Sequence, residues 1–386
     1  MTSTLKLPYK FVHLQRNFKS KVVKKSLILI FMLALLMPSA LLANSEVPVS
    51  AEKSETKDVS SEVVEHIMNH VADANENHIA TIHEAGVEKH ISLPLPCILY
   101  NKSTGKLSVF MSSKLHDSHE GYDGYKMDNH TNRVVDAETG KRDTFYDFSI
   151  TKNVFNMLLG FFILTIIFFI IKAAYVKRAG QAPTGIQSFF EPIIQFLIDE
   201  VAKPNLGAKY EKFLPYLICV FFFILINNLL GLVPFIGGIN SSGNISFTLV
   251  LAMCSLLLIN LNGNKHYWQH IFAMPGVPKW VLVILTPIEL LGVVLKPAVL
   301  MLRLFGNITG GHIAVLAIVS LIFIMGKMGT TIGGATAGGA IAIPILLFVN
   351  AMELFVAFLQ AYVFTLLTAI FIGAAIEDHH HAEENH

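Results

Sequence analysis

Apolar residues in this chain gather into long runs instead of alternating with polar ones. Residues 154–171, 213–235 and 245–261 each have the length and composition of a membrane-spanning helix. Two further runs, residues 280–325 and 341–376, are too long for one upright span. The first would form a helix of about 69 Å, against a hydrocarbon core of about 30 Å. The chain is therefore predicted to be an all-α polytopic membrane protein with about five membrane helices.

The last two runs are joined by glycine-rich sequence at residues 326–340, which predicts a loop. We expect the two runs to form a hairpin of long, strongly inclined helices. Another stretch, which precedes the second span, keeps its apolar residues on one helical face. It predicts an amphipathic helix at the membrane interface or against a partner. The apolar face is made of Phe189, Phe190, Ile193, Ile194, Leu197, Ile198 and Val201.

Basic residues indicate the orientation of the membrane domain, which we expect at residues 149–376. Lys172, Lys177 and Arg178 follow the first span, and Lys265 lies in the loop after the third. Because cytoplasmic loops carry an excess of Lys and Arg, these ends are predicted to be cytoplasmic. The number of spans then places the polar tail, residues 377–386, on the cytoplasmic side as well.

The first 43 residues have the features of a secretory signal peptide. A short apolar run at residues 27–37 follows Lys19, Lys21, Lys24 and Lys25, and small residues follow it up to Ala43. The alternative is a retained first membrane helix, for which the run is short. Cleavage after Ala43 would leave the new N-terminus outside the cytoplasm of a bacterium.

Residues 44–148 are polar and are predicted to form a small extracytoplasmic region. Apolar residues at helical spacing in residues 63–71 indicate a short amphipathic helix. Residues 90–95 and 106–111 flank a Ser-Thr-Gly turn and predict a β-hairpin. His66 and His70 lie one helical turn apart, but no third ligand accompanies them, so we interpret them as surface residues and predict no metal site.

Composition narrows the class of function further. The formal net charge of +1 gives no support for nucleic-acid binding. Two of the three cysteines, Cys219 and Cys254, lie in apolar runs and Cys97 lies outside them, which is no disulfide framework. With 53% hydrophobic residues, the chain falls among polytopic membrane proteins. No cofactor is predicted.

One arginine stands out in the first long run. Arg303 has apolar sequence on both sides, so its guanidinium is expected at membrane depth, where it costs roughly 3 kcal/mol and cannot lose its proton. Glu289 and Lys296 precede it at intervals of seven residues and share its helical stripe, and Asn307 lies one turn beyond it. A buried charge of this kind indicates a functional site. The alternatives are an arginine that only holds helices together and, for Glu289 and Lys296, positions near lipid headgroups.

The second long run has a polar face of its own. Asn350, Glu353 and Gln360 lie close together on a helical wheel, and Asn228 lies at membrane depth in the second span. Two polar sets on separate helices and one permanent positive charge suggest aqueous access from both sides that does not join. Arg303 suits the barrier between them, because it repels cations and attracts a carboxylate.

These residues carry a resemblance to subunit a of the F-type ATP synthase, which extends over about residues 150–376. The polar N-terminal region resembles, more loosely, the longer forms found in Bacteroidetes-type bacteria. In many family members a carboxylate stands at the place of His312 and a histidine at that of Glu353, and here the two are exchanged. The matching motifs are Lys296-Pro297, Arg303-Leu304-Phe305-Gly306-Asn307, Asn228 with Leu232-Val233-Pro234, Glu289, and Gln360-Ala361-Tyr362-Val363-Phe364.

The resemblance implies a non-catalytic stator subunit of a bacterial plasma membrane complex. It implies two offset proton half-channels that serve the carboxylates of a rotating c-ring, with Arg303 between them. His312, Glu353, Gln360 and Asn228 would belong to the outer half-channel, Glu289 to the cytoplasmic one, and Asn307 to the proton path. The implied partners are the c-ring, the peripheral-stalk b subunits, the rest of the synthase and membrane lipid. The surroundings of the ring carboxylate decide between H⁺ and Na⁺.

The alternative class is a self-contained secondary ion transporter. Such a protein usually has repeated halves with matching broken helices. The sequence contains no such internal similarity, which favours the stator.

Overall fold

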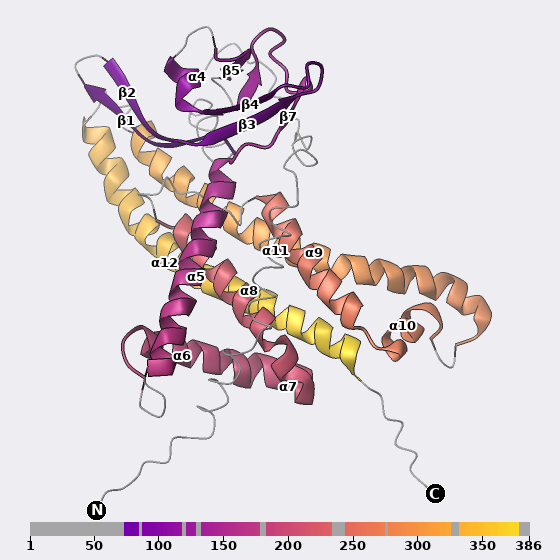
Figure 1. Ribbon diagram of the computed structural model, residues 1–386. Coiled ribbons are helices and arrows are strands. Elements are labelled where there is room, and N and C mark those ends of the chain that lie inside the picture. The colour runs from indigo at the N-terminus through magenta and orange to yellow at the C-terminus, as the bar shows by residue number, and fades with distance from the viewer. Residues whose placement is uncertain are drawn as a thin grey trace, which may run out of the picture.

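The computed structural model describes residues 73–84, 87–117, 121–128, 133–177, 183–233, 244–274, 277–325 and 332–377. The chain has a small β-rich part near its N-terminus and a helical part below it (Figure 1). The predicted signal peptide, the helix predicted at residues 63–71 with its two histidines, and nearly all of the polar tail lie outside the described residues.

The N-terminal part consists of short antiparallel strands in three sheets. The sheets are the pair β1 and β2, the three strands in the order β4-β3-β7, and the pair β5 and β6. Cys97, Leu99, Phe110 and Phe145 of the three-stranded sheet pack with residues of α4, β5 and β6 in one apolar core. The elements are β1 Glu76–Glu84, β2 Val87–Pro94, β3 Pro96–Asn101, β4 Leu107–Met111, α4 Ser113–Asp117, β5 Tyr125–Met127, β6 Val134–Asp136 and β7 Phe145–Asp147.

The predicted hairpin is half correct. Its turn and its second strand are found, but the strand that pairs with β4 is β3, Pro96–Asn101, and not residues 90–95. Residues 90–94 belong to β2, which pairs with β1. The physical reason lies in the turn, where Asn101 N donates to Lys106 O and Gly105 N to Asn101 O. This tight closure pairs β4 with the residues directly before the turn.

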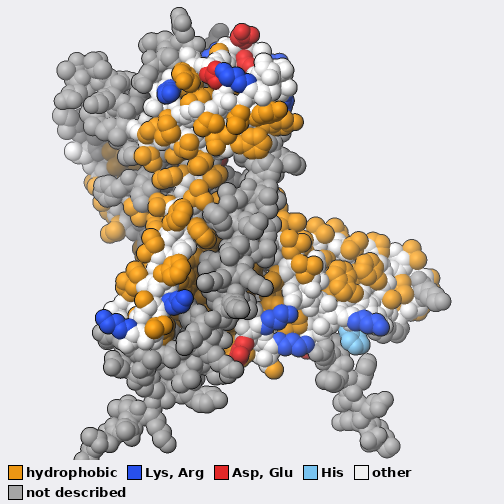
Figure 2. All heavy atoms as spheres, viewed as in Figure 1, with side chains coloured by type: hydrophobic (Ala, Val, Ile, Leu, Met, Phe, Trp, Pro, Cys, Tyr) orange, Lys and Arg blue, Asp and Glu red, His pale blue; other side chains and the backbone are white. Residues whose placement is uncertain are grey.

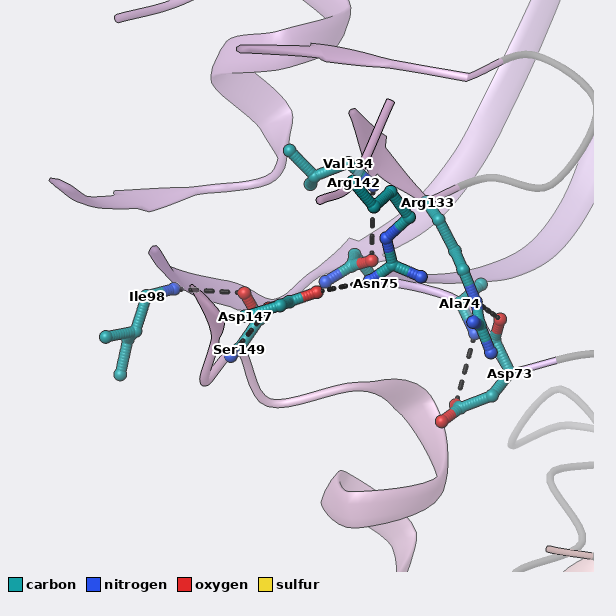
Figure 3. A network of polar contacts seen from close by, with 9 residues as sticks. All are labelled: Asp73, Ala74, Asn75, Ile98, Arg133, Val134, Arg142, Asp147 and Ser149. Carbon is teal, nitrogen blue, oxygen red and sulfur yellow. Dashed lines mark hydrogen bonds and ion pairs between the residues drawn. The ribbon is translucent and has the colours of Figure 1, made fainter. Parts of the chain in front are cut away.

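A polar network holds the N-terminal part together where it meets the first membrane helix (Figure 3). Arg142 Nη2 donates to Asp147 Oδ2 at 2.7 Å, and Asp147 Oδ1 accepts from Ser149 N at 2.9 Å. Ser149 Oγ in turn accepts from Ile98 N at 3.0 Å. Burial raises the pKa of the Asp73 carboxyl, although nearby Arg133 opposes that rise. The entry into the membrane part is therefore a fixed junction.

The helical part contains, within the described residues, five stretches long and apolar enough to cross a membrane. This confirms the prediction of a polytopic membrane protein with about five membrane helices. Short helical segments accompany the long helices. The elements are α5 Lys152–Lys177, α6 Ile186–Phe196, η2 Leu197–Ala202, α7 Lys203–Leu206, η3 Gly207–Lys209, α8 Tyr210–Gly231, α9 Ile245–Asn262, α10 Lys265–Phe272, α11 Lys279–Met325 and α12 Ile332–Ile376.

The inclined hairpin is found as predicted: α11 and α12 run obliquely to α5 and lie against each other (Figure 1). The predicted loop at residues 326–340 is wrong in its second half, because α12 already begins at Ile332. The reason is the packing of Gly338, where an added Cβ would lie 3.1 Å from Met325 Cβ and 3.2 Å from Ile322 Cα. Small residues let two membrane helices approach closely, so the glycines serve the helix contact here.

Helix α8 forms the centre of the membrane part. Its residues from Phe213 to Asn228 are buried on all sides, and it packs against α5 and α12. Helix α11 packs against α9 and α12 and leaves much of its surface open. The predicted amphipathic helix is found as α6 and η2, with Ile194, Leu197 and Val201 buried. The predicted loop after α9 contains one further short helix, α10.

Charged side chains mark the two ends of the molecule. Figure 2 shows Lys and Arg gathered at the lower edge of the helical part and mixed charges at the upper end of the N-terminal part. Hydrophobic side chains dominate between these two bands. This distribution is the one expected for a chain that crosses a bilayer between them.

Candidate functional site

The site is built where α11 and α12 cross, and its register follows from two contacts. Asn307 Nδ2 donates to Gln360 Oε1 at 3.0 Å, and Lys296 Nζ lies 5.5 Å from the ring centroid of Phe371. Eleven residues separate Lys296 from Asn307 on α11, and eleven separate Gln360 from Phe371 on α12. The two antiparallel helices therefore stay in step over this length, and residues on each can be matched in depth.

Along the helix axis, Arg303 lies one turn before Asn307, and Glu353 is level with residues that follow Asn307. Arg303 is exposed, whereas Leu300, Leu304 and Ile308 of α11 are buried against the neighbouring helices. Among the described residues, no ion pair or hydrogen bond of the guanidinium is found. Arg303 is thus an exposed cation near the middle of the long apolar helix α11.

Gln360 differs from the expectation in its partner. The polar faces of the two long runs predict that Gln360 lies close enough to Arg303 to form a hydrogen bond or share a water molecule. Its side-chain oxygen instead accepts from Asn307, one turn further along α11, and no direct hydrogen bond to Arg303 is found among the described residues. Gln360 itself is buried. The Asn307–Gln360 hydrogen bond joins the two arms of the hairpin directly beside the arginine.

Glu353 lies seven residues before Gln360 on the same face of α12, about 10 Å along the axis. Its side chain is buried and lies against the backbone of α11 at Gly311, where an added Cβ would be 3.0 Å from Glu353 Oε1. An ionised carboxylate is costly to bury without a partner. His312 follows Gly311 directly, so its backbone is level with Glu353, but its side chain lies outside the described part of the structure.

Helix α8 adds a buried amide to the same region. Asn228 Nδ2 donates to the backbone oxygen of Ala357 at 3.3 Å, and Ala357 lies midway between Glu353 and Gln360. Its neighbour Asn227 is fully buried and packs against Gly160 of α5, where an added Cβ would lie 2.7 Å from the amide nitrogen. The structure therefore places Asn228, Gln360 and Asn307 where three helices meet, with Glu353 about two turns away along α12, and we call these four residues the polar group.

Glu289 does not join that group. It lies 18 residues before Asn307 on α11, about 27 Å along the axis, and is half-buried. Arg303 lies between the two, four residues from Asn307 and 14 from Glu289. The polar residues of α11 thus form two sets, separated by the arginine.

Three buried hydroxyl groups that were not predicted from the sequence lie in a row. Tyr216 OH and Ser255 Oγ lie 2.9 Å apart, and Ser255 Oγ lies 3.5 Å from Thr368 Oγ1. The three buried groups belong to α8, α9 and α12, and Thr368 is two turns beyond Gln360. Single hydroxyl residues in apolar runs are common in membrane helices, so only the fold identifies these three as neighbours.

Comparison with known proteins follows the same division of the chain. A family model described as "ATP synthase A chain" matches residues 155–373, more than half of the chain. A second model, described as "Domain of unknown function (DUF8433)", matches residues 66–154. The boundary between the two matches falls in the first turn of α5.

Three relatives illustrate the similarity. The chain is 43% identical over 236 residues to "ATP synthase subunit a 2" of Chlorobaculum tepidum. The aligned region covers 60% of this chain and 64% of that relative. It is 39% identical to "ATP synthase subunit a" of Pelodictyon phaeoclathratiforme, over 61% of this chain and 68% of the relative. For the protein of the same name from Chloroherpeton thalassium, the identity is 35% over 71% of this chain and 80% of the relative.

Proposed function

Because the chain belongs to the family of F-type ATP synthase subunit a, we propose that it is the stator that feeds ions to a rotating ring of c subunits. In this proposal the chain forms two offset half-channels, one on each side of Arg303. The observation that best supports this proposal is the position of Arg303. It lies on the open surface of α11, between the polar group around Gln360 and the distant Glu289. The chain itself makes and breaks no covalent bond.

The proton path on one side runs through the polar group at the helix crossing. Glu353, Gln360 and Asn228 supply carboxyl and amide groups within an otherwise apolar interior, and Asn307 adds an amide at its exposed edge. Groups of this kind can pass protons or order the water molecules that do. His312, level with Glu353, adds an imidazole, which changes its charge near physiological pH.

Arg303 would act on the ring carboxylate as it passes. An ion pair at 4 Å is worth roughly 4 kcal/mol at an effective dielectric constant of 20. The pair favours the ionised carboxylate only where it meets the guanidinium, so the proton leaves there. The membrane potential supplies about 2.3 kcal/mol per charge for each 100 mV, which turns the ring when several steps add up.

The test of the proposed role is ATP-driven acidification of inverted vesicles that contain the complete synthase. We expect acidification by synthase that contains this chain, and none by synthase assembled without it. Adding sodium distinguishes the coupling ion, since a sodium-coupled ring would pump less proton as sodium rises. Equal acidification with and without the chain would rule out the stator role.

A glycine beside Glu353 provides a prediction at the entry of the path. Replacing Gly311 with alanine would place a methyl group 3.0 Å from Glu353 Oε1 and so displace the carboxyl. Strain from such overpacking is about 1–3 kcal/mol, so pumping is expected to slow by roughly tenfold. Gly310→Ala is the matched control, because nothing lies within 4 Å of its added Cβ. Equal pumping rates in the two assembled variants would contradict a role for the carboxyl at this position.

A further inference from the structure

The outward side of the sheet β4-β3-β7 carries apolar and aromatic residues. Antiparallel sheets with one solvated face normally alternate apolar and polar residues. In this sheet the inward positions Cys97, Leu99, Phe110 and Phe145 already fill the core, yet the alternate positions are apolar too. We name these alternate positions the outer sheet face, which consists of Pro96, Ile98, Tyr100, Leu107, Val109, Met111 and Tyr146.

The outer sheet face is one continuous patch. Ile98 pairs with Val109, and Tyr100 pairs with Leu107 on one side and Tyr146 on the other. Leu107 and Val109 are 59% and 64% exposed. A contiguous apolar patch on a folded domain marks an interaction site, in contrast to hydrophobic residues scattered singly.

The patch is held at a fixed place beside the first membrane helix. Four residues, 148–151, separate β7 from α5, a distance of at most about 14 Å. Backbone hydrogen bonds tie this connection to β3, since Ile150 N donates to Pro96 O and Phe148 N to Ile98 O. The sheet therefore cannot swing away from the point at which α5 enters the membrane.

The surface of α5 also carries exposed apolar side chains. Phe162, Ile166 and Phe169 of α5 are 57%, 58% and 60% exposed, as expected of side chains that face lipid. Figure 2 shows hydrophobic side chains at the lower end of the N-terminal part and along the helix below it, with charged side chains at the upper end. The apolar end of the N-terminal part thus lies toward the helical part, and the charged end lies away from it (Figure 2).

The chemistry at the rim also fits a bilayer surface. Tyrosine rings are enriched at the boundary between lipid and water. Lys102 Nζ lies 4.5 Å from the ring centroid of Tyr146, at the edge of the patch, and donates to Asp143 O at 2.7 Å. A lysine in this position covers apolar surface with its stem and offers its ammonium group to lipid phosphates.

We propose that the outer sheet face rests on the phospholipid surface at the end where α5 enters the bilayer. The N-terminal part is then a membrane-apposed anchor that restrains α5, with the apolar residues sunk about 5–10 Å into the boundary region. This inference is independent of ion translocation, because it concerns residues of the N-terminal part and α5 alone.

The experiment uses the full chain, reconstituted in vesicles of phosphatidylethanolamine and phosphatidylglycerol, with a spin label at V109C. The matched control is E138C, in the exposed turn after β6. The three native cysteines are buried, so wild-type chain gives the background. We expect oxygen, which concentrates in lipid, to relax the label at residue 109, and a water-soluble nickel complex to relax the label at residue 138. The ratio of the two accessibilities should differ several-fold between the sites.

Two results would overturn the inference. A label at residue 109 that meets the nickel complex as freely as the label at residue 138 would place the outer sheet face in water. A label shielded from both reagents would mean that a protein surface covers it. A second label, at L107C, should report the same environment as residue 109, and a disagreement between the two would also count against a lipid-facing sheet.

Discussion

Synthase that carries Arg303→Ala is expected to assemble normally and to lose ATP-driven proton pumping. The guanidinium lies on the open surface of α11 and makes no described contact that holds the fold. In the proposed mechanism, its loss removes the ion pair with the ring carboxylate, worth roughly 4 kcal/mol, which corresponds to a rate about a thousand-fold lower. The measurement is acidification of inverted vesicles at equal synthase content.

The control for this variant is Leu302→Ala at the adjacent position, which is also exposed. This substitution removes apolar surface and no charge, so it should leave pumping nearly intact. Arg303→Lys should fail almost as completely as alanine, because an ammonium is more strongly hydrated and cannot present a planar fork of donors. Pumping near the wild-type rate in assembled Arg303→Ala synthase would disprove the role of the charge.

The second large effect is expected from exchanging His312 and Glu353. The backbone of His312 is level with Glu353 across the hairpin, beside Gly311. If imidazole and carboxyl relay protons as a pair, His312→Glu alone and Glu353→His alone should each slow proton pumping by roughly tenfold or more, as expected when general acid–base groups are lost. The double exchange restores one imidazole and one carboxyl and should recover part of the rate.

The comparison needs all three variants at matched assembly. A buried ion pair with a purely structural role would also favour the double exchange, but it would show in thermal stability as much as in rate. The relay predicts a pH profile of pumping that changes in each single variant and returns in the double one. Equal loss of pumping in all three variants would speak against the pair.

The long helices could be predicted from the sequence because hydrocarbon thickness and backbone hydrogen bonding leave few choices for an apolar run. The start of α12 could not be predicted in this way. Glycines such as Gly338 read as a loop by propensity, but the close approach of α11 keeps them helical. The missing arm of the β-hairpin has a related cause: Ile98 and Tyr100 are apolar on the outward side, so β3 lacks the alternation that identifies a strand.

Prediction from the sequence is limited in the same way for the candidate site. A helical wheel groups Glu353 with Gln360 and Arg303 with Asn307, and both groupings hold along their own helices. Which residues face each other across the hairpin depends on where two helices cross, and that is set by packing around Leu300, Leu304 and Phe364. This is why Gln360 meets Asn307, one turn from the expected arginine.

The central claim is that Arg303 separates two half-channels, and the collapse of an imposed pH gradient tests it most directly. Vesicles should contain the complete synthase without nucleotide, so that the attached catalytic part restrains the ring. With Arg303 in place the gradient should persist, because the guanidinium repels protons between the two polar sets. With Arg303→Ala the gradient should collapse faster, although ATP-driven pumping is lost. A gradient equally persistent in both would contradict the account.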